Sequence, residues 1–174
     1  MIVIVEGPDL SGKTTAIEKL GKKFNSGFTL KNNFKPRTKE ESELIYNHYS
    51  EILNLVAAWH MLHPSNLIIL DRFYPSQQVY SILRGKDEMN QWELLDIERR
   101  CKEFNVKLIM LDTPLEELKS RHEHRGDDYV KRSQLEMLKE RYDKAYLQSR
   151  LERMSVNTMD RDWLKQVEVF LKWE

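Results

Sequence analysis

Several features of extracellular, membrane-bound or polymer-binding proteins are missing from this chain of 174 residues. Its single cysteine, Cys101, allows no internal disulfide, which fits a reducing compartment. No apolar stretch approaches the roughly 20 residues of a membrane span. The first apolar run, residues 1–5, is too short for a signal peptide and has no basic start. We therefore expect a cytoplasmic protein that contacts no membrane.

Net charge is also absent, because 28 Lys and Arg residues balance 28 Asp and Glu residues. A chain without excess charge has no general electrostatic attraction for polymeric nucleic acid or for an anionic membrane. Any anion that it binds must be held by a local site.

The chain has only five prolines and six glycines, and they lie between segments with regular spacing of apolar residues. No repeat or linker interrupts the chain, so we expect one domain over residues 1–174. Continuous apolar runs predict buried parallel strands at 2–5, 67–70, 107–111 and 154–157, with a further candidate at 28–31. Helical spacing of apolar residues recurs between them, at 44–59, 135–151 and 163–171. This alternation predicts an α/β fold with a doubly wound parallel sheet of about five strands, flanked by helices.

A phosphate-binding loop is the strongest motif. The segment from Gly7 to Thr14 fits G-x-x-x-x-G-K-[ST], follows an apolar strand and precedes a helical stretch. Backbone N–H groups of such a loop converge on phosphates, and the helix N-terminus adds a favourable dipole. We expect Lys13 to neutralise the β- and γ-phosphates of ATP and Thr14 to ligate Mg²⁺.

A carboxylate at the end of the strand at 67–70 is the second candidate. Asp71 is expected to help hold Mg²⁺ or to orient an acceptor oxygen. Asp112 also ends a strand and competes for this role. The sequence Asp112-Thr113-Pro114 is more typical of the start of a helix, with Thr113 as its cap, so Asp71 is favoured.

Arginines gather around the predicted strand ends. Arg72 and Arg37 both follow strands, and arginine grips phosphate bidentately, so together they favour a bound monophosphate. The basic run at 121–128 lies between two helical patterns and predicts a short mobile lid that brings Arg121 and Arg125 onto the transferring phosphoryl group. A solvated helix end is the alternative for this run. Its two histidines lack further ligands nearby, which argues against a metal site.

These motifs resemble the thymidylate kinase family. The loop Glu6-Gly-Pro-Asp9-Leu-Ser-Gly-Lys-Thr-Thr15 is similar to E-G-x-D-x-x-G-K-[ST]-T, and Asp71-Arg-Phe-Tyr-Pro-Ser-Gln-Gln-Val-Tyr80 is similar to D-R-[YF]-x-x-S-x-x-x-Y. The segment that begins at Leu111 resembles the family's fourth strand and lid. The resemblance covers most of the chain in matching order, and it implies a P-loop kinase fold.

The resemblance also implies roles for individual residues. The loop residues and Arg121 would bind the donor ATP, with Lys13, Asp71 and Arg125 as catalytic residues. Because Leu10 replaces an arginine of the loop, the catalytic arginine is expected in the lid, at Arg125. Tyr80 looks like the family tyrosine that leaves no room for a 2′-hydroxyl. The donor-binding residues are expected to be Gly7, Asp9, Ser11, Gly12, Lys13, Thr14, Thr15 and Arg121. The acceptor-binding residues are expected to be Asp9, Arg37, Tyr46, His48, Tyr49, Arg72, Ser76, Gln77 and Tyr80.

One departure from the family pattern concerns the acceptor base. Thymidylate kinases carry an arginine that faces thymine in the helix after the second strand, whereas residues 38–63 contain no arginine. Tyr46, His48 and Tyr49 are the candidates to face the pocket instead. We therefore expect ATP-dependent phosphorylation of dTMP, dUMP or a modified pyrimidine deoxynucleoside monophosphate.

Three alternatives remain at this point. A deoxynucleoside kinase would use Asp71 as a base toward a 5′-hydroxyl. A regulatory GTPase is disfavoured because no Asn-Lys-x-Asp segment is present. A catalytically idle nucleotide-binding scaffold is disfavoured by the complete set of candidate catalytic residues. The family is often homodimeric, and the apolar stripe at 44–59 fits either a dimer interface or a core helix.

Overall fold

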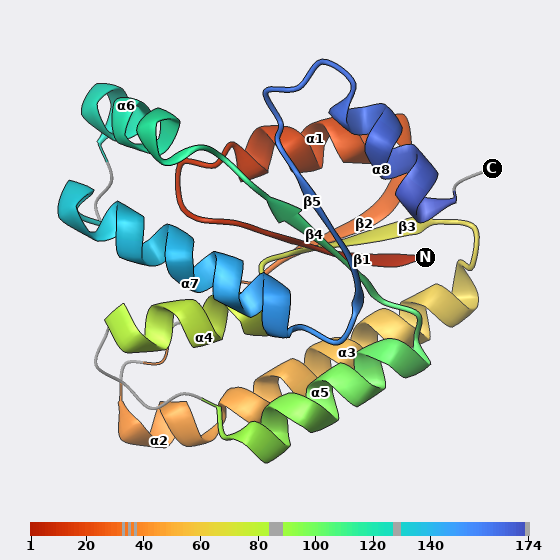
Figure 1. Ribbon diagram of the computed structural model, residues 1–174. Coiled ribbons are helices and arrows are strands. Elements are labelled where there is room, and N and C mark those ends of the chain that lie inside the picture. The colour runs from red at the N-terminus through yellow and green to blue at the C-terminus, as the bar shows by residue number, and fades with distance from the viewer. Residues whose placement is uncertain (33, 35, 37, 84–88, 127–129, 173–174) are drawn as a thin grey trace.

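Five parallel strands form one sheet in the order β2-β3-β1-β4-β5 (Figure 1). The computed structural model describes residues 1–32, 34, 36, 38–83, 89–126 and 130–172. The strands are β1 (Ile2–Glu6), β2 (Ser26–Lys31), β3 (Leu67–Asp71), β4 (Lys107–Leu111) and β5 (Glu152–Val156). All five match predicted strands, although β2 and β5 each begin two residues earlier than expected.

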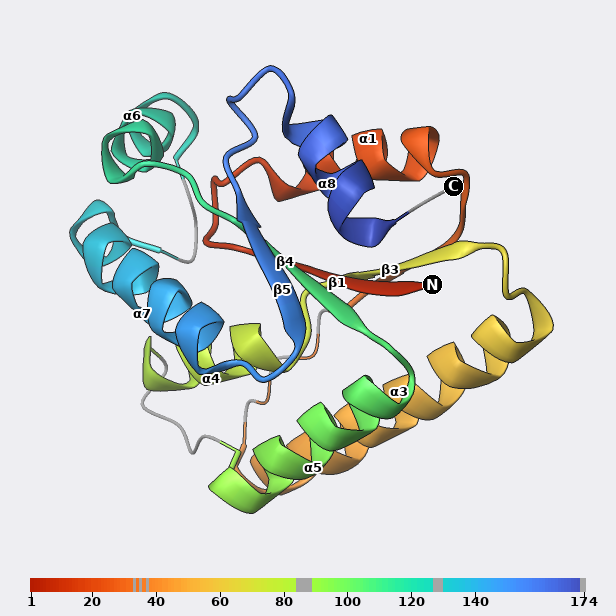
Figure 2. The same cartoon turned by 45° about the vertical axis from the view of Figure 1, so that its right-hand side comes forward.

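Helices cover both faces of the sheet (Figure 2). They are α1 (Lys13–Lys23), α2 (Lys39–Glu43), α3 (Ile45–Leu62), α4 (Tyr74–Leu83), α5 (Gln91–Glu103), α6 (Leu115–Arg125), the 3₁₀ turn η1 (Arg132–Gln134), α7 (Leu135–Gln148) and α8 (Trp163–Leu171). Alternate strand residues point to opposite faces. Ile2 and Ile4 therefore pack with α3 and α5, whereas Val3 and Val5 pack with α1 and α8. This two-sided burial confirms the doubly wound α/β prediction.

The apolar stripe of the predicted helix at 38–63 faces the core. The helix is interrupted at Leu44, which separates α2 from α3. Ile45, Ile52, Leu53 and Val56 are buried against the sheet. The stripe therefore serves as a core face, and a homodimer stays a prediction. Within the described part of the chain, no helix is long and apolar enough to span a membrane.

One prediction at the start of α6 is wrong. The Thr113 hydroxyl does not cap the helix but donates to the carbonyl oxygen of Ser11 at 3.2 Å, which ties the end of β4 to the loop after β1. Residues 121–125 of the predicted lid form the last part of α6, which ends at Gly126, and the lid role of this segment stays a prediction. Residues 127 and 128 of the predicted lid lie outside the described residues.

Candidate active site

The loop between β1 and α1 depends on two glycines. Gly7 has φ +151°, and a Cβ added there would lie 3.0 Å from both the Leu111 carbonyl oxygen and Ser11 Oγ. Gly12 is left-handed, with φ +84°, and directly precedes α1. Among the described residues, no side chain caps the first turn of α1. The free N–H groups of that turn are the donors that a phosphate needs.

Lys13 closes this loop from within. Its Nζ donates to the Gly7 carbonyl oxygen at 3.2 Å. Burial and then the neighbouring Arg72 guanidinium lower the pKa of Lys13 to about 8. A phosphate beside Nζ would raise this pKa again, because it favours the charged form of the lysine.

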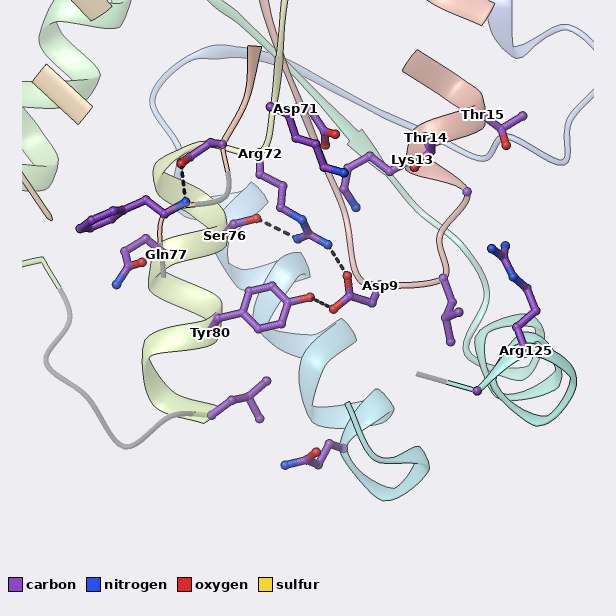
Figure 3. Close-up of a pocket in the computed structure, with 18 of the residues that line it drawn as sticks. Asp9, Lys13, Thr14, Thr15, Asp71, Arg72, Ser76, Gln77, Tyr80 and Arg125 are labelled. Carbon is purple, nitrogen blue, oxygen red and sulfur yellow. Dashed lines mark hydrogen bonds and ion pairs between the residues drawn. The ribbon is translucent and has the colours of Figure 1, made fainter. Parts of the chain in front are cut away.

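One cleft of about 750 Å³ joins the loop to the facing wall (Figure 3). Thr14 and Thr15 lie on the loop side, and Arg72 and Tyr80 lie opposite. Clefts of this size accommodate small organic ligands. The predicted site residues that line the cleft are Asp9, Gly12, Lys13, Thr14, Thr15, Tyr49, Asp71, Arg72, Ser76, Gln77, Tyr80 and Arg125.

Arg72 is held by three separate parts of the chain. Its backbone is left-handed, with φ +67°, which is uncommon for a residue with a side chain. Its guanidinium pairs with Asp9 of the loop and donates to Ser76 Oγ of α4 at 3.0 Å. It also donates to the hydroxyl of Tyr142 on α7 at 2.7 Å. The side chain is 19% exposed, so most of it is withdrawn from solvent while it still borders the cleft.

Asp9 is fully engaged in this arrangement. One carboxylate oxygen pairs with Arg72, and the other accepts from the Tyr80 hydroxyl at 2.5 Å (Figure 3). Burial raises the pKa of Tyr80, so the phenol stays protonated and acts as the donor. Asp9 therefore lines the cleft as predicted, but its two oxygens already have partners.

Glu6 organises the wall behind Arg72, a role that the motif alone did not indicate. Its side chain is fully buried at the end of β1. One oxygen accepts from the backbone N–H of Phe73 at 2.6 Å and of Ser76 at 3.3 Å, and the other accepts from Ser76 Oγ at 2.6 Å. The carboxylate thus satisfies N–H groups at the start of α4 and fixes the segment that follows Arg72. Burial raises the pKa of Glu6, and Arg72 and these hydrogen bonds oppose that rise.

The two predicted base-facing residues of α4 differ in their contacts. Ser76 donates its proton to Glu6 and accepts from Arg72, so its hydroxyl belongs to the wall of the cleft. Gln77 is 3% exposed and lines the cleft, and its Nε2 has no hydrogen-bond partner among the described residues. An unpaired buried amide is costly unless a ligand satisfies it. Gln77 is therefore the better candidate to contact an acceptor.

Only one of the three predicted residues of α3 reaches the cleft. Tyr49 lines it, buried to 2% exposure. Tyr46 does not, because its hydroxyl donates to Asp96 of α5 at 2.7 Å on another side of the helix. His48 lies behind the wall, where Nε2 is 3.1 Å from Asn32 Oδ1 and the ring stacks on Phe34 at 4.3 Å. Arg37, the fourth acceptor candidate from this region, lies outside the described residues.

The two strand-end aspartates differ in position, and the metal-binding role of Asp71 stays a prediction. Asp71 lines the cleft with Thr14. Asp112 is exposed and pairs with Lys139 at 2.8 Å. Among the residues that the structure describes, no cluster of three His, Cys, Asp or Glu side chains could hold a metal alone. Oxygen donors from Thr14 and Asp71 suit Mg²⁺, which usually takes few protein ligands and completes its shell with water and phosphate.

The arginines of α6 lie over the loop. Arg121 Nη1 donates to the Leu10 carbonyl oxygen at 2.8 Å, and Nε donates to Glu117 at 2.7 Å. Arg125 is exposed and borders both the main cleft and a second hollow of about 310 Å³. Arg121, Thr158 and Trp163 line that second hollow beside Gly12. Ser11 reaches neither space: its Oγ is buried without a partner among the described residues.

No known protein-family model matches the chain. It is 26% identical over 143 residues, 81% of this chain and 79% of the relative, to YorR, an uncharacterized protein derived from the SPbeta prophage of Bacillus subtilis strain 168. The crystal structure of YorR in complex with phosphorylated GDP matches with a TM-score of 0.78 at 23% identity, covering 99% of this chain and 95% of that chain.

Solved kinases share the architecture at lower similarity. A thymidylate kinase from Candida albicans matches with a TM-score of 0.58 at 17% identity, over 98% of this chain and 91% of its own. A deoxyadenosine kinase from M. mycoides with bound dATP matches with a TM-score of 0.55 at 17% identity, over 99% and 98%. The chain has the fold of the P-loop nucleotide kinases. The predicted fold class and the resemblance to thymidylate kinase are thereby confirmed at the level of architecture.

Proposed function

We propose that this chain is an ATP- and Mg²⁺-dependent kinase that phosphorylates a deoxynucleoside monophosphate, namely dTMP, dUMP or a modified pyrimidine nucleotide. One observation carries this proposal. A single cleft combines a complete phosphate-binding loop with a facing wall that presents Arg72, the Gln77 amide and the Tyr80 hydroxyl. A donor phosphate and a polar acceptor can therefore meet in the same space.

On the donor side, the free N–H groups before and within the first turn of α1 bind the phosphates, and Lys13 neutralises their charge. The γ-phosphorus forms a bond to an acceptor oxygen while its bond to the β,γ-bridging oxygen breaks, and ADP leaves. Thr14 and Asp71 would hold Mg²⁺, which when bound offsets negative charge on the β- and γ-phosphates. Arg121 and Arg125 sit at the rim of the loop, where positive charge stabilises the charge of the transferring group.

On the acceptor side, the remaining N–H groups of Arg72 bind the monophosphate, and Gln77 pairs with the base. Tyr80 and Tyr49 close the wall around the sugar and base. A monophosphate oxygen is already ionised, so the chemistry needs positioning and charge neutralisation more than a strong base. Arg37 is proposed as a second phosphate ligand on the strength of the family resemblance.

A deoxynucleoside kinase is the second candidate, and one observation favours it. Arg72 is already paired with Asp9, so a dianionic monophosphate must compete with a carboxylate for the same guanidinium. A neutral 5′-hydroxyl would not meet this competition, and Asp71 could then accept its proton. The likeness to a deoxyadenosine kinase supports testing both acceptors, and the complex of YorR with phosphorylated GDP supports testing guanine nucleotides in both roles.

Phosphorylation of a panel of acceptors tests the proposal. The panel contains the common deoxynucleosides, the deoxy- and ribonucleoside monophosphates and 5-substituted deoxyuridine monophosphates, with ATP or GTP as donor and product masses as the readout. We expect a diphosphate product from one pyrimidine deoxynucleotide. Products from nucleosides alone would transfer the chain to the second candidate. The Lys13→Ala variant is the control and should lose most turnover while it remains folded.

A further inference from the structure

Tyr142 is a buried tyrosine that the proposed reaction does not use. It lies on α7, 70 residues from Arg72, and is 1% exposed. Its hydroxyl is 2.7 Å from Arg72 Nη1 and 2.9 Å from Ser76 Oγ, and its side chain does not border the cleft. It therefore touches a residue of the acceptor wall without facing the acceptor.

The direction of each hydrogen bond follows from counting protons. A serine hydroxyl has one proton and a guanidinium nitrogen can only donate. Ser76 gives its proton to Glu6 at 2.6 Å, so it must accept from both Arg72 and Tyr142. Burial raises the pKa of Tyr142, so its proton is available for Ser76. Tyr142 thus accepts from Arg72 and donates to Ser76, which closes a ring formed by Arg72 Nη1, the Tyr142 hydroxyl and Ser76 Oγ.

This ring determines which hydrogens of Arg72 remain for a ligand. The hydrogens of Nη1 are directed to Ser76 and Tyr142, with the Gly7 carbonyl oxygen more distant at 3.5 Å. One hydrogen of Nη2 is directed to Asp9. Among the described residues, the Nε hydrogen and the second Nη2 hydrogen of Arg72 have no hydrogen-bond partner. Nε and Nη2 share one edge of the planar group, and such an edge suits a bidentate phosphate.

We propose that Tyr142 is a positioning residue: its hydroxyl orients Arg72 so that one edge of the guanidinium is kept for the phosphate of the acceptor. This inference rests on the proposed function. The support comes from α7, which packs on α4 and α6 through Val79, Leu118 and Leu138. Because α6 also carries Arg121 and Arg125, the same helix α7 supports arginines on both the donor side and the acceptor side of the cleft.

The Tyr142→Phe variant removes only the hydroxyl, and Tyr146→Phe in the same helix is the matched control. We expect Tyr142→Phe to lower kcat/KM for the acceptor about 10-fold, the effect typical of one hydrogen bond to a charged group. The KM for the donor and the melting temperature should equal those of the control. An unchanged acceptor kcat/KM, or an equal loss for donor and acceptor, would overturn the inference.

A double-mutant cycle tests whether Tyr142 acts through Arg72. In an Arg72→Gln background, the further change Tyr142→Phe should alter acceptor affinity less than about two-fold, because the coupled partner is gone. Additive losses would mean that Tyr142 contacts the ligand or acts elsewhere, which contradicts the proposal.

Direct binding of the monophosphate panel, measured by calorimetry, separates this inference from the proposed reaction. If no acceptor is phosphorylated but Tyr142→Phe still binds a monophosphate about 10-fold more weakly than Tyr146→Phe, the kinase proposal fails and the positioning role stands. If acceptors are phosphorylated and both variants bind and turn over alike, the kinase proposal stands and the role of Tyr142 is refuted. Absence of monophosphate binding to the wild type would refute both.

Discussion

The pKa of Lys13 predicts a proton uptake that accompanies donor binding. Burial and the Arg72 guanidinium lower this pKa to about 8 in the ligand-free protein, whereas Asp9, Glu6 and Asp71 act in the opposite direction. Phosphate oxygens beside Nζ favour the ammonium form and raise the pKa again. Donor binding therefore requires the charged form, and it takes up a proton whenever Lys13 is neutral beforehand.

The magnitude follows from titration of one group. With a pKa of about 8, the free protein has about half of its Lys13 side chains charged at pH 8 and about a tenth at pH 9. We expect kcat/KM for the donor to fall about 10-fold from pH 7 to pH 9, because this ratio reports the free enzyme. The contribution of Lys13 to kcat should stay constant over the same range, because the bound phosphate keeps the lysine charged.

Calorimetry in two buffers that differ in ionisation enthalpy measures the proton directly. We expect an uptake of about half a proton per donor at pH 8, falling toward zero at pH 6.5. A Lys13→Arg variant is the control, because arginine stays charged and its binding should take up no proton in this range. No uptake at pH 8, or an alkaline inflection near pH 10 in kcat/KM, would refute the reasoning.

Two further predictions concern charged side chains: the two strand-end aspartates and a buried lysine. Asp71→Asn should reduce turnover about 10–100-fold, as expected for a residue that helps to hold a metal. Asp112→Asn should leave turnover unchanged, because Asp112 is exposed and pairs with Lys139 outside the cleft; equal losses in the two variants would contradict the assignment. Lys107 is 4% exposed and donates to Glu152 at 3.0 Å and to a carbonyl oxygen of α8 at 2.9 Å. Lys107→Met should lower the free energy of unfolding by about 1–3 kcal/mol in a denaturant titration, with catalysis unaffected; an unchanged midpoint would mean that the carbonyl oxygen finds another partner.

The features that the sequence predicted well are those encoded by adjacent residues. The loop from Gly7 to Thr14 is a local device, in which a strand, a turn and a helix start follow one another, so its motif and its geometry coincide. The strands were equally accessible, because parallel strands covered on both faces are continuous apolar runs. The motif and the strand end also located Asp71 and Arg72 at the same edge of the sheet.

Long-range pairings explain what the sequence could not predict. Tyr142 resembles any apolar residue of a helical stripe, and only tertiary packing brings its hydroxyl to Arg72. Tyr46 and Tyr49 are three residues apart on α3, yet one faces α5 and the other faces the cleft. Periodicity defines the faces of a helix but not which neighbour each face meets. The contact of Thr113 could not be predicted either, because a threonine at this position could cap the helix or donate to Ser11, and the sequence is the same in both cases.

The ion pair between Asp9 and Arg72 bears on the choice between the two candidate functions, because it sets the charge that an acceptor meets in the cleft. The chain has no net charge, and Arg72 is offset by Asp9 beside it and by Glu6 through Ser76. A monophosphate that binds the free edge of Arg72 brings two negative charges close to the Asp9 carboxylate, which raises the free energy of the complex unless Lys13, Mg²⁺ or a further arginine offsets them. A nucleoside brings none. The Asp9→Asn variant should therefore strengthen binding of a monophosphate measured without donor or metal, and leave binding of a nucleoside almost unchanged. Weaker binding of both ligands would instead mean that Asp9 acts mainly by holding Arg72 and Tyr80 in place.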